Sequence, residues 1–166
     1  MPFYLKEVDV VPEVAKFQSA LIVICRFCPA ASLAVRNQQP YLEFFRRFLK
    51  TESWEQHVNN VRSRLEKEGV KTSVFKGNLL NFIICMWTSG QRKKLLKRAS
   101  EYEAVVVMGC EGAYEGVSNM IKSTDCQVFQ SMKSEGILAA TPKFHLPFNI
   151  SLELFGVTQI HQKKNE

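Results

Sequence analysis

Short apolar runs alternate with longer amphipathic segments along most of the chain. Residues 19–24 (SALIVI) and 104–108 (AVVVM) are continuous apolar runs rich in branched side chains. Such runs are typical of strands that are buried on both faces of a parallel sheet. Residues 70–75 (VKTSVF) alternate apolar and polar side chains and predict another strand, and residues 127–129 (QVF) predict a short fourth one.

Helices are expected between these strands. Pro29 suits the first turn of a helix, which then continues as far as Asn37. Apolar side chains at helical spacing predict further helices in four segments: 41–49, 53–65, 91–99 and 111–122. Residues 79–87 (LLNFIICMW) fit a helix or a strand equally well.

The order of these elements predicts an α/β fold. We expect a single three-layer domain, in which helices flank a mostly parallel sheet of about 4–5 strands. Residues 144–155 alternate apolar and polar side chains, which fits an antiparallel edge strand at the C-terminal side. The domain is expected to span residues 19–155, between an N-terminal arm (1–18) and a polar tail (156–166).

Composition and charge narrow the class of protein. The chain has 166 residues, of which 46% are hydrophobic, enough for one compact domain with its own core. Its apolar runs are shorter than the roughly 20 residues of a membrane-spanning helix. The N-terminus lacks the layout of a signal peptide. We therefore expect a cytoplasmic protein with no membrane partner.

Five cysteines are an odd number for a disulfide framework: Cys25, Cys28, Cys85, Cys110 and Cys126. In a reducing compartment they are expected to be free thiols, metal ligands or transient redox pairs. The alternative is that they are small buried apolar side chains, which is a common role of free cysteine.

Residues able to carry chemistry follow the predicted strands. Ligand sites of open α/β sheets lie beyond the carboxyl ends of their strands. Cys25 and Cys28 follow the first strand, Lys76 and Asn78 follow the second, and Cys110 follows the third. Two separate strand ends therefore carry cysteine.

The cysteine spacing predicts a metal site. A C-x-x-C pair at a helix start can direct both sulfurs at one metal ion, and the helix N-terminus favours the thiolate. If the first and third strands are neighbours, Cys25, Cys28 and Cys110 would converge. We expect them to bind zinc or an iron–sulfur cluster, with Cys85, His145, water or a cofactor atom as the fourth ligand.

A glycine-rich turn in GCEGAYEG gives a second set of candidates. Gly109, Glu111 and Gly112, together with Lys76 and Asn78, are candidate cofactor-binding residues at the same edge of the sheet. The glycines alternatively only form the turn between strand and helix. The sequence contains no dinucleotide fingerprint, no phosphate-binding P-loop and no nucleophile elbow.

Two resemblances bear on function. VVVMGCEGA, together with the C-x-x-C, resembles small cysteine-containing Rossmann-like accessory proteins of anaerobic iron–sulfur, metal or one-carbon metabolism, which implies a cluster or zinc at the cysteines. More weakly, CRFCP and ATPKF resemble the C-x-x-C and the cis-proline loop of the thioredoxin superfamily. That likeness covers Cys25, Cys28, Thr141 and Pro142.

Three functions remain open. The first is an accessory or electron-transfer module with a metal or iron–sulfur centre. The second is a thiol–disulfide oxidoreductase, in which Cys25 attacks and Cys28 resolves. The third is a non-catalytic interaction or ligand-binding domain whose cysteines are structural.

Partners are expected to be proteins. The net charge is +6, and the basic helix 91–99 and the C-terminal strand 144–155 are the expected docking surfaces. A homodimer is another possible arrangement. Nucleic acid is disfavoured, because no recognised binding motif accompanies the basic helix.

Overall fold

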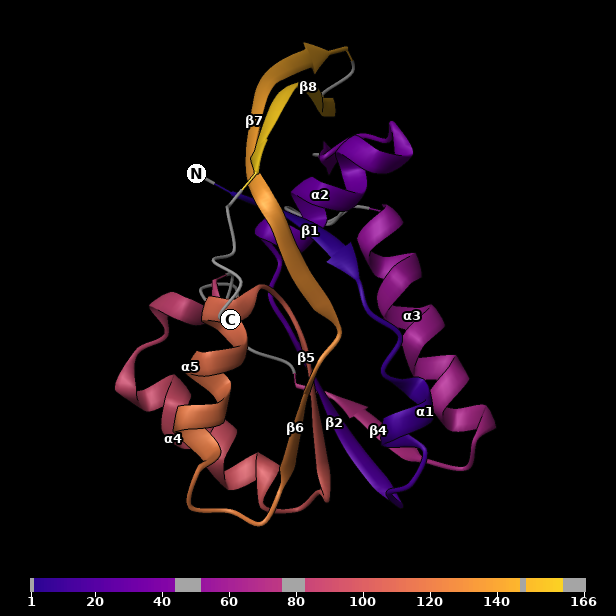
Figure 1. Ribbon diagram of the computed structural model, residues 1–166, viewed down its shortest axis with the longest axis vertical. Coiled ribbons are helices and arrows are strands. Elements are labelled where there is room, and N and C mark those ends of the chain that lie inside the picture. The colour runs from indigo at the N-terminus through magenta and orange to yellow at the C-terminus, as the bar shows by residue number, and fades with distance from the viewer. Residues whose placement is uncertain (1, 44–51, 76–82, 147–148, 160–166) are drawn as a thin grey trace, which may run out of the picture.

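The protein consists of two sheets with helices packed around them (Figure 1). The structure is a computed structural model, and it describes residues 2–43, 52–75, 83–146 and 149–159. Among these segments, no helix combines the length and apolar character needed to cross a bilayer.

The first sheet has four parallel strands, as the sequence predicts. They are β2 (Ser19–Ile24), β4 (Lys71–Val74), β5 (Ala104–Met108) and β6 (Gln127–Gln130), in the spatial order β4-β2-β5-β6. All five residues of β5 are buried, because strands lie on both sides of it and helices flank the sheet. The α/β class and the mostly parallel sheet are confirmed.

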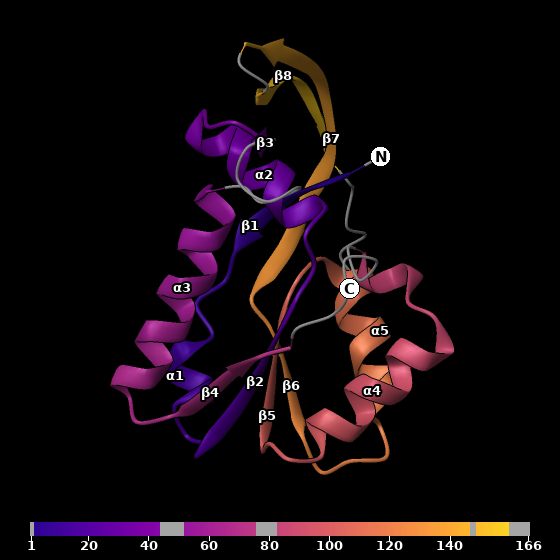
Figure 2. The same ribbon diagram turned by 180° about the vertical axis from the view of Figure 1, so that it is seen from behind.

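Helices lie on both sides of this sheet, which gives the expected three layers. The long helices are α2 (Cys28–Asn37), α3 (Glu52–Lys67), α4 (Ser89–Ala99) and α5 (Glu111–Ile121). α4 and α5 pack together on one side, and α3 lies on the other side with the short helix α1 (Val11–Val14) (Figures 1 and 2). α3 buries Trp54, Val58, Val61 and Leu65, a stripe at helical spacing.

The second sheet is antiparallel and separate from the first. It contains β1 (Phe3–Glu7), β3 (Leu42–Glu43), β7 (Met132–His145) and β8 (Asn149–Gln159), in the order β1-β7-β8-β3. The C-terminal strand is thus antiparallel, as expected. It does not lie at an edge of the parallel sheet, because β8 pairs with β7 on one side and with β3 on the other. Of the expected strand 144–155, Phe144 and His145 belong to β7.

The N-terminal residues belong to the core. Leu5 is fully buried in β1, and Val10, Val11 and Val14 are buried around α1. The expected arm (1–18) therefore contains a strand and a helix, and β8 extends four residues into the expected polar tail, to Gln159. These contacts attach the antiparallel sheet to the parallel one.

The structure describes parts of two further segments, the expected helix 41–49 and the run 79–87, which fits a helix or a strand. Leu42 and Glu43 pair with β8 rather than continuing a helix, and the rest of the expected helix 41–49 lies outside the described residues. In the ambiguous run 79–87, residues Ile84–Met86 form a 3-10 turn, η1, and residues 79–82 lie outside the described part.

The connections of the parallel sheet create a topological switch point. The chain leaves β2 and reaches β4 on one side of it, and it then crosses back to β5 on the other side of β2. At such a topological switch point, the connections diverge beyond the carboxyl ends of the two central strands. The switch point therefore lies after Ile24 of β2 and Met108 of β5.

Candidate functional site

The switch point brings the two cysteine-bearing strand ends together. β2 and β5 are hydrogen-bonded neighbours, with Ile24 opposite Met108. The backbone N–H of Cys25 donates to the carbonyl of Met108 at 3.0 Å. The expectation that Cys25 and Cys110 reach the same place depended on this strand order, and the structure meets that condition.

Gly109 allows the close approach of the two strand ends. A Cβ atom at Gly109 would lie 2.7 Å from the Cβ of Ala113 and 3.2 Å from the Cβ of Cys25. The first distance is shorter than side-chain carbons tolerate, so any larger residue would push α5 or Cys25 away. The glycine is explained by this packing, whatever ligand the site holds.

Cys28 and Cys110 form the direct contact of the site. A hydrogen bond between the two sulfurs lowers the pKa of Cys110 to about 6, and the backbone N–H groups of Ala113 and Gly112 contribute in the same direction. The same hydrogen bond raises the pKa of Cys28, and burial adds to that. Cys110 is therefore the thiolate of the pair, and Cys28 is the thiol that donates to it.

Cys25 is the most enclosed of these thiols, with 2% of its surface exposed. Burial raises its pKa, and the backbone N–H groups of Phe27 and Ile84 partly oppose this by hydrogen bonding to its sulfur. Charges on Cys110 and Cys85 would raise the pKa further. Cys25 is thus a protonated thiol fixed by backbone donors.

Cys85 completes a group of four cysteines. It lies in η1 and is exposed, next to Met86, which is 75% exposed. Burial and then the charge of Cys110 raise its pKa, so the two sulfurs lie within electrostatic reach of each other. The sequence suggested Cys85 only as a fourth ligand, because its apolar neighbours fit a core segment.

The N-terminal strand also borders the site, which the sequence gave no sign of. The backbone N–H of Phe3 hydrogen-bonds to Cys28. Ser32, fully buried in α2, accepts a hydrogen bond from the N–H of Leu5 at 2.9 Å and lies 2.8 Å from the carbonyl of Cys28. Burial, followed by the charges of Cys28 and Cys25, raises the pKa of Tyr41 to about 12.

The other cofactor-binding candidates have mixed placements. Glu111 accepts a hydrogen bond from the backbone N–H of Ser134 at 2.8 Å, so its carboxylate connects α5 to β7. A Cβ atom at Gly112 would lie 3.9 Å from the Cys110 sulfur. Lys76 and Asn78 lie outside the described residues.

Three further candidates lie away from the cysteine group. The Cys126 sulfur donates to the carbonyl of Tyr102 at 2.6 Å or of Ala99 at 2.9 Å, near the amino ends of the strands. His145 lies on the β7–β8 hairpin, with its Nε2 2.8 Å from the hydroxyl of Ser151. Thr141 and Pro142 are part of the same hairpin, paired with Glu153 and Leu152.

The cysteines are not preassembled around a metal position. None of the five cysteines forms a disulfide. Within the described residues, no group of three or more histidine, cysteine, aspartate or glutamate side chains is arranged so that it could hold a metal ion. Cys28 and Cys110 are in contact, and Cys25 and Cys85 lie within electrostatic reach of Cys110.

Comparison with known proteins does not add a relative. Neither the known family models, nor the curated proteins, nor the solved structures gave a significant match to the chain. The functional argument therefore rests on the site itself.

Proposed function

We propose that the protein is an accessory or electron-transfer module that holds an iron–sulfur centre at the switch point. Its ligands would be Cys25, Cys28 and Cys110, with Cys85 as the fourth. The observation that supports the proposal is the contact between Cys28 and Cys110, with Cys25 and Cys85 within electrostatic reach, at the strand ends where ligands of parallel α/β sheets bind.

We propose a cluster in preference to a single zinc ion, because within the described residues no three of these side chains surround one metal position. A structural zinc site needs four ligand atoms about 2.3 Å from one point when they are sulfur. An iron–sulfur cluster distributes its four thiolates over several iron atoms and therefore accepts a wider ring of sulfurs. Binding would require the Cys28–Cys110 hydrogen bond to break and the four side chains to turn toward a common centre.

The surroundings suit a one-electron carrier. Backbone N–H groups of Phe27 and Ile84 reach the sulfur of Cys25, and those of Gly112 and Ala113 reach the sulfur of Cys110. Hydrogen bonds to cluster sulfurs and solvent exposure are two features that set the reduction potential of such centres. The exposed Cys85 side of the site would be the point where electrons enter and leave.

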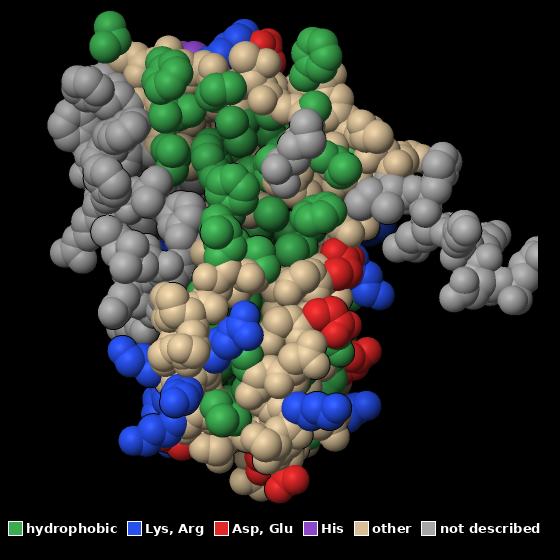
Figure 3. All heavy atoms as spheres, turned by 90° about the vertical axis from the view of Figure 1, so that its left-hand side faces the viewer, with side chains coloured by type: hydrophobic (Ala, Val, Ile, Leu, Met, Phe, Trp, Pro, Cys, Tyr) green, Lys and Arg blue, Asp and Glu red, His purple; other side chains and the backbone are tan. Residues whose placement is uncertain are grey.

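Protein partners are part of the proposal. The β7–β8 hairpin exposes Phe144 at 78% and Phe155 at 88% of their surface. Figure 3 shows apolar side chains gathered on one face of the upper half of the molecule, above a part with more lysine and arginine. An accessory protein of the reducing cytoplasm would use such an apolar face to dock on the enzyme that it serves.

Reconstitution without oxygen tests the proposal. Protein incubated with ferrous iron and sulfide should acquire iron, acid-labile sulfide and visible absorption. Cys110→Ser and Cys28→Ser should each lose most of the iron, because each removes a ligand. Cys126→Ser is the matched control, since Cys126 lies outside the group, and it should bind as much iron as the wild type.

Equal iron content in the wild type and in Cys110→Ser would contradict the proposal, as would a wild-type protein that acquires no iron. A parallel incubation with zinc separates the two metals. Stoichiometric zinc binding without iron binding would replace the cluster by a mononuclear site.

The Cys28–Cys110 contact favours a second candidate, thiol–disulfide exchange. The Cys110 thiolate would attack one sulfur of a disulfide substrate and release the other as a thiolate. Cys28 would then lose its proton and attack the Cys110 sulfur, which forms the Cys28–Cys110 disulfide and releases the second substrate thiol. The pair differs from the Cys25 and Cys28 pair that the C-x-x-C motif suggests.

Oxidised glutathione distinguishes the two pairs. We expect metal-free protein to lose two hydrogens and to yield a peptide that contains Cys28 linked to Cys110. Cys25→Ser should form the same link, because the buried Cys25 takes no part in it. A Cys25–Cys28 disulfide, or glutathione adducts alone, would count against this candidate.

A further inference from the structure

We propose that the groove between the edge strand β4 and the helix α4 binds an extended acidic segment of a partner protein, which would pair with β4 as an added strand. This proposal is independent of any metal at the cysteines. It names a partner chemistry for the basic helix that the sequence singles out.

The first observation is the open strand edge. β4 ends the order β4-β2-β5-β6, and among the described residues no strand pairs with its outer side. The N–H groups of Lys71 and Phe75 donate inward, to Gln18 and Ile22 of the β2 side, each at 2.8 Å. Because backbone groups alternate along a strand, those of Thr72 and Val74 face outward.

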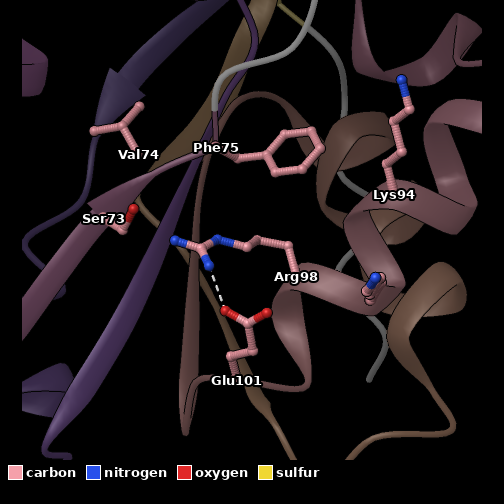
Figure 4. A pocket seen from close by; sticks show the side chains of 7 residues that line it. Ser73, Val74, Phe75, Lys94, Arg98 and Glu101 are labelled. Atoms are coloured by element: carbon pink, nitrogen blue, oxygen red, sulfur yellow. Dashed lines mark hydrogen bonds and ion pairs between the residues drawn. The ribbon is translucent and has the colours of Figure 1, made fainter.

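The second observation is a hollow beside that edge. It has a volume of about 530 Å³, within the range of about 300–1,000 Å³ that is typical of ligand sites. It is lined by the end of β4 and by one side of α4: Ser73, Val74, Phe75, Lys94, Lys97, Arg98 and Glu101. In Figure 4, the side chains of Phe75 and Arg98 both lie in the gap between strand and helix.

Charge identifies the chemistry of the occupant. Three of the lining side chains are cationic and one is a carboxylate. Arg98 forms an ion pair with that carboxylate, Glu101, so the groove already holds one acidic group (Figure 4). Lys94 and Lys97 have no ion pair with any described residue, and they would receive carboxylates of a bound segment.

An apolar contact can fix the register of the added strand. The Phe75 ring packs against Trp87, with ring centroids 5.6 Å apart and planes inclined at 44°. Trp87 is buried, so its packing holds the Phe75 ring in place next to the open edge of β4. In a segment that alternates acidic and apolar residues, the acids would lie on the α4 side, where Phe75 also lies, and the apolar side chains would lie on the opposite face, beside Val74.

A second copy of this chain is a poor occupant. The chain carries a net charge of +6, and its last eight residues (HQKKNE preceded by Gln159 and Ile160) include two lysines and one glutamate. Two such copies would repel each other at a basic groove. A nucleotide is also a poorer fit, because phosphate sites are commonly built from backbone N–H groups at a helix N-terminus, whereas this groove presents a strand edge and basic side chains.

Three capped peptides test the proposal with the full chain. The first alternates glutamate and valine, the second has lysine in place of glutamate, and the third is the acidic peptide with N-methylated backbone amides. Only the acidic unmethylated peptide should bind well. N-methylation should weaken binding about tenfold or more, because it removes the main-chain hydrogen bonds.

Two charge-reversal variants locate the binding. Lys97→Glu should weaken binding of the acidic peptide about tenfold. Lys93→Glu changes the net charge by the same amount, but Lys93 lines a separate hollow with Arg92 and Met120, so binding should change little. Hydrogen exchange should slow at Thr72 and Val74 in the presence of the peptide.

Several results would overturn the proposal. They are no binding of the acidic peptide, equal binding of its N-methylated form, and equal loss in the two lysine variants. Tighter binding of ATP, with displacement of the peptide and no protection of β4, would assign the groove to a nucleotide instead. None of the variants touches a cysteine, so failure here leaves the iron experiment unaffected.

Discussion

At Cys110, two features of different origin favour the thiolate. The Cys28 thiol donates a hydrogen bond, and the first turn of α5 contributes the N–H groups of Gly112 and Ala113. Burial and, to a lesser extent, the negative charge of Glu111 act against both, yet the pKa of Cys110 still falls to about 6. We therefore expect the thiolate of the metal-free protein at Cys110, at the third strand end, and not in the C-x-x-C motif itself.

The ultraviolet thiolate absorbance of the reduced, metal-free protein should reflect this. One thiolate should appear with a midpoint near pH 6, and Cys110→Ser should abolish that step. Cys28→Ser should move the midpoint upward, because the donor to the thiolate is lost. A first thiolate midpoint near 8.5, the ordinary value for cysteine, would show that the hydrogen bond does not exist in solution.

The same shift has a consequence for stability. The folded-state pKa of Cys110 is depressed, so its contribution is complete above the ordinary thiol pKa and is lost as the pH falls through about 6. Cys28 has a raised pKa and acts in the opposite sense, since its contribution is lost as the solution becomes alkaline. The pair is therefore most stabilising between these limits.

Single residues also show how far the sequence alone could lead. The position of cysteines at two strand ends was visible in the apolar runs that precede Cys25 and Cys110. The contact between Cys28 and Cys110 was not, because it depends on β2 and β5 being neighbours. The pattern around Cys85 predicts a core residue, since the amino acids beside it are apolar.

Among the elements, β1 has the least obvious role. It forms an edge of the antiparallel sheet and it also contacts α2, through Ser32. The hydroxyl of Ser32 accepts from Leu5 and can donate to the carbonyl of Phe3 at 3.0 Å. One buried side chain thus holds the N-terminal strand against the helix that carries Cys28.

Ser32→Ala should therefore destabilise the protein by about 1–3 kcal/mol, because the buried N–H of Leu5 loses its acceptor. Chemical denaturation monitored by circular dichroism would measure this. Ser118→Ala is a matched control, since the buried hydroxyl of Ser118 has no hydrogen-bond partner in the described part of the chain. Equal effects of the two substitutions would contradict the assigned role of Ser32.

Elements with a strong local signal were predictable, and those formed by distant pairing were not. α4 was expected from its basic run, and its start is fixed by a capping box between Thr88 and Gln91. The two-residue strand β3 exists only because β8 lies beside it. Residues 3–7 have no pattern that distinguishes a strand from an arm until β7 is in place.

At the scale of the whole molecule, the parallel sheet followed from the order of strands and helices. The second sheet did not, because it joins the two ends of the described chain, and local periodicity carries no information about such pairing. The hairpin of that sheet extends beyond its neighbours (Figure 1), and a bulge opposite Ala139 and Ala140 leaves Phe155 as the unpaired residue. Phe155 is exposed at this bulge, whereas Phe144 is exposed in the regular part of the ladder, where it pairs with Ile150.

The crossing of the chain at the switch point also has a meaning for folding. Cys28 and Cys110 bracket α2, α3, β4, α4 and β5 along the sequence. Any covalent or metal-mediated link between them would close a loop that contains β4 and β5, two of the four parallel strands. Closing a loop of this length lowers the conformational entropy of the unfolded chain by an amount worth about 4–5 kcal/mol. Formation of such a link and folding of the parallel sheet would then be coupled, so that each would stabilise the other.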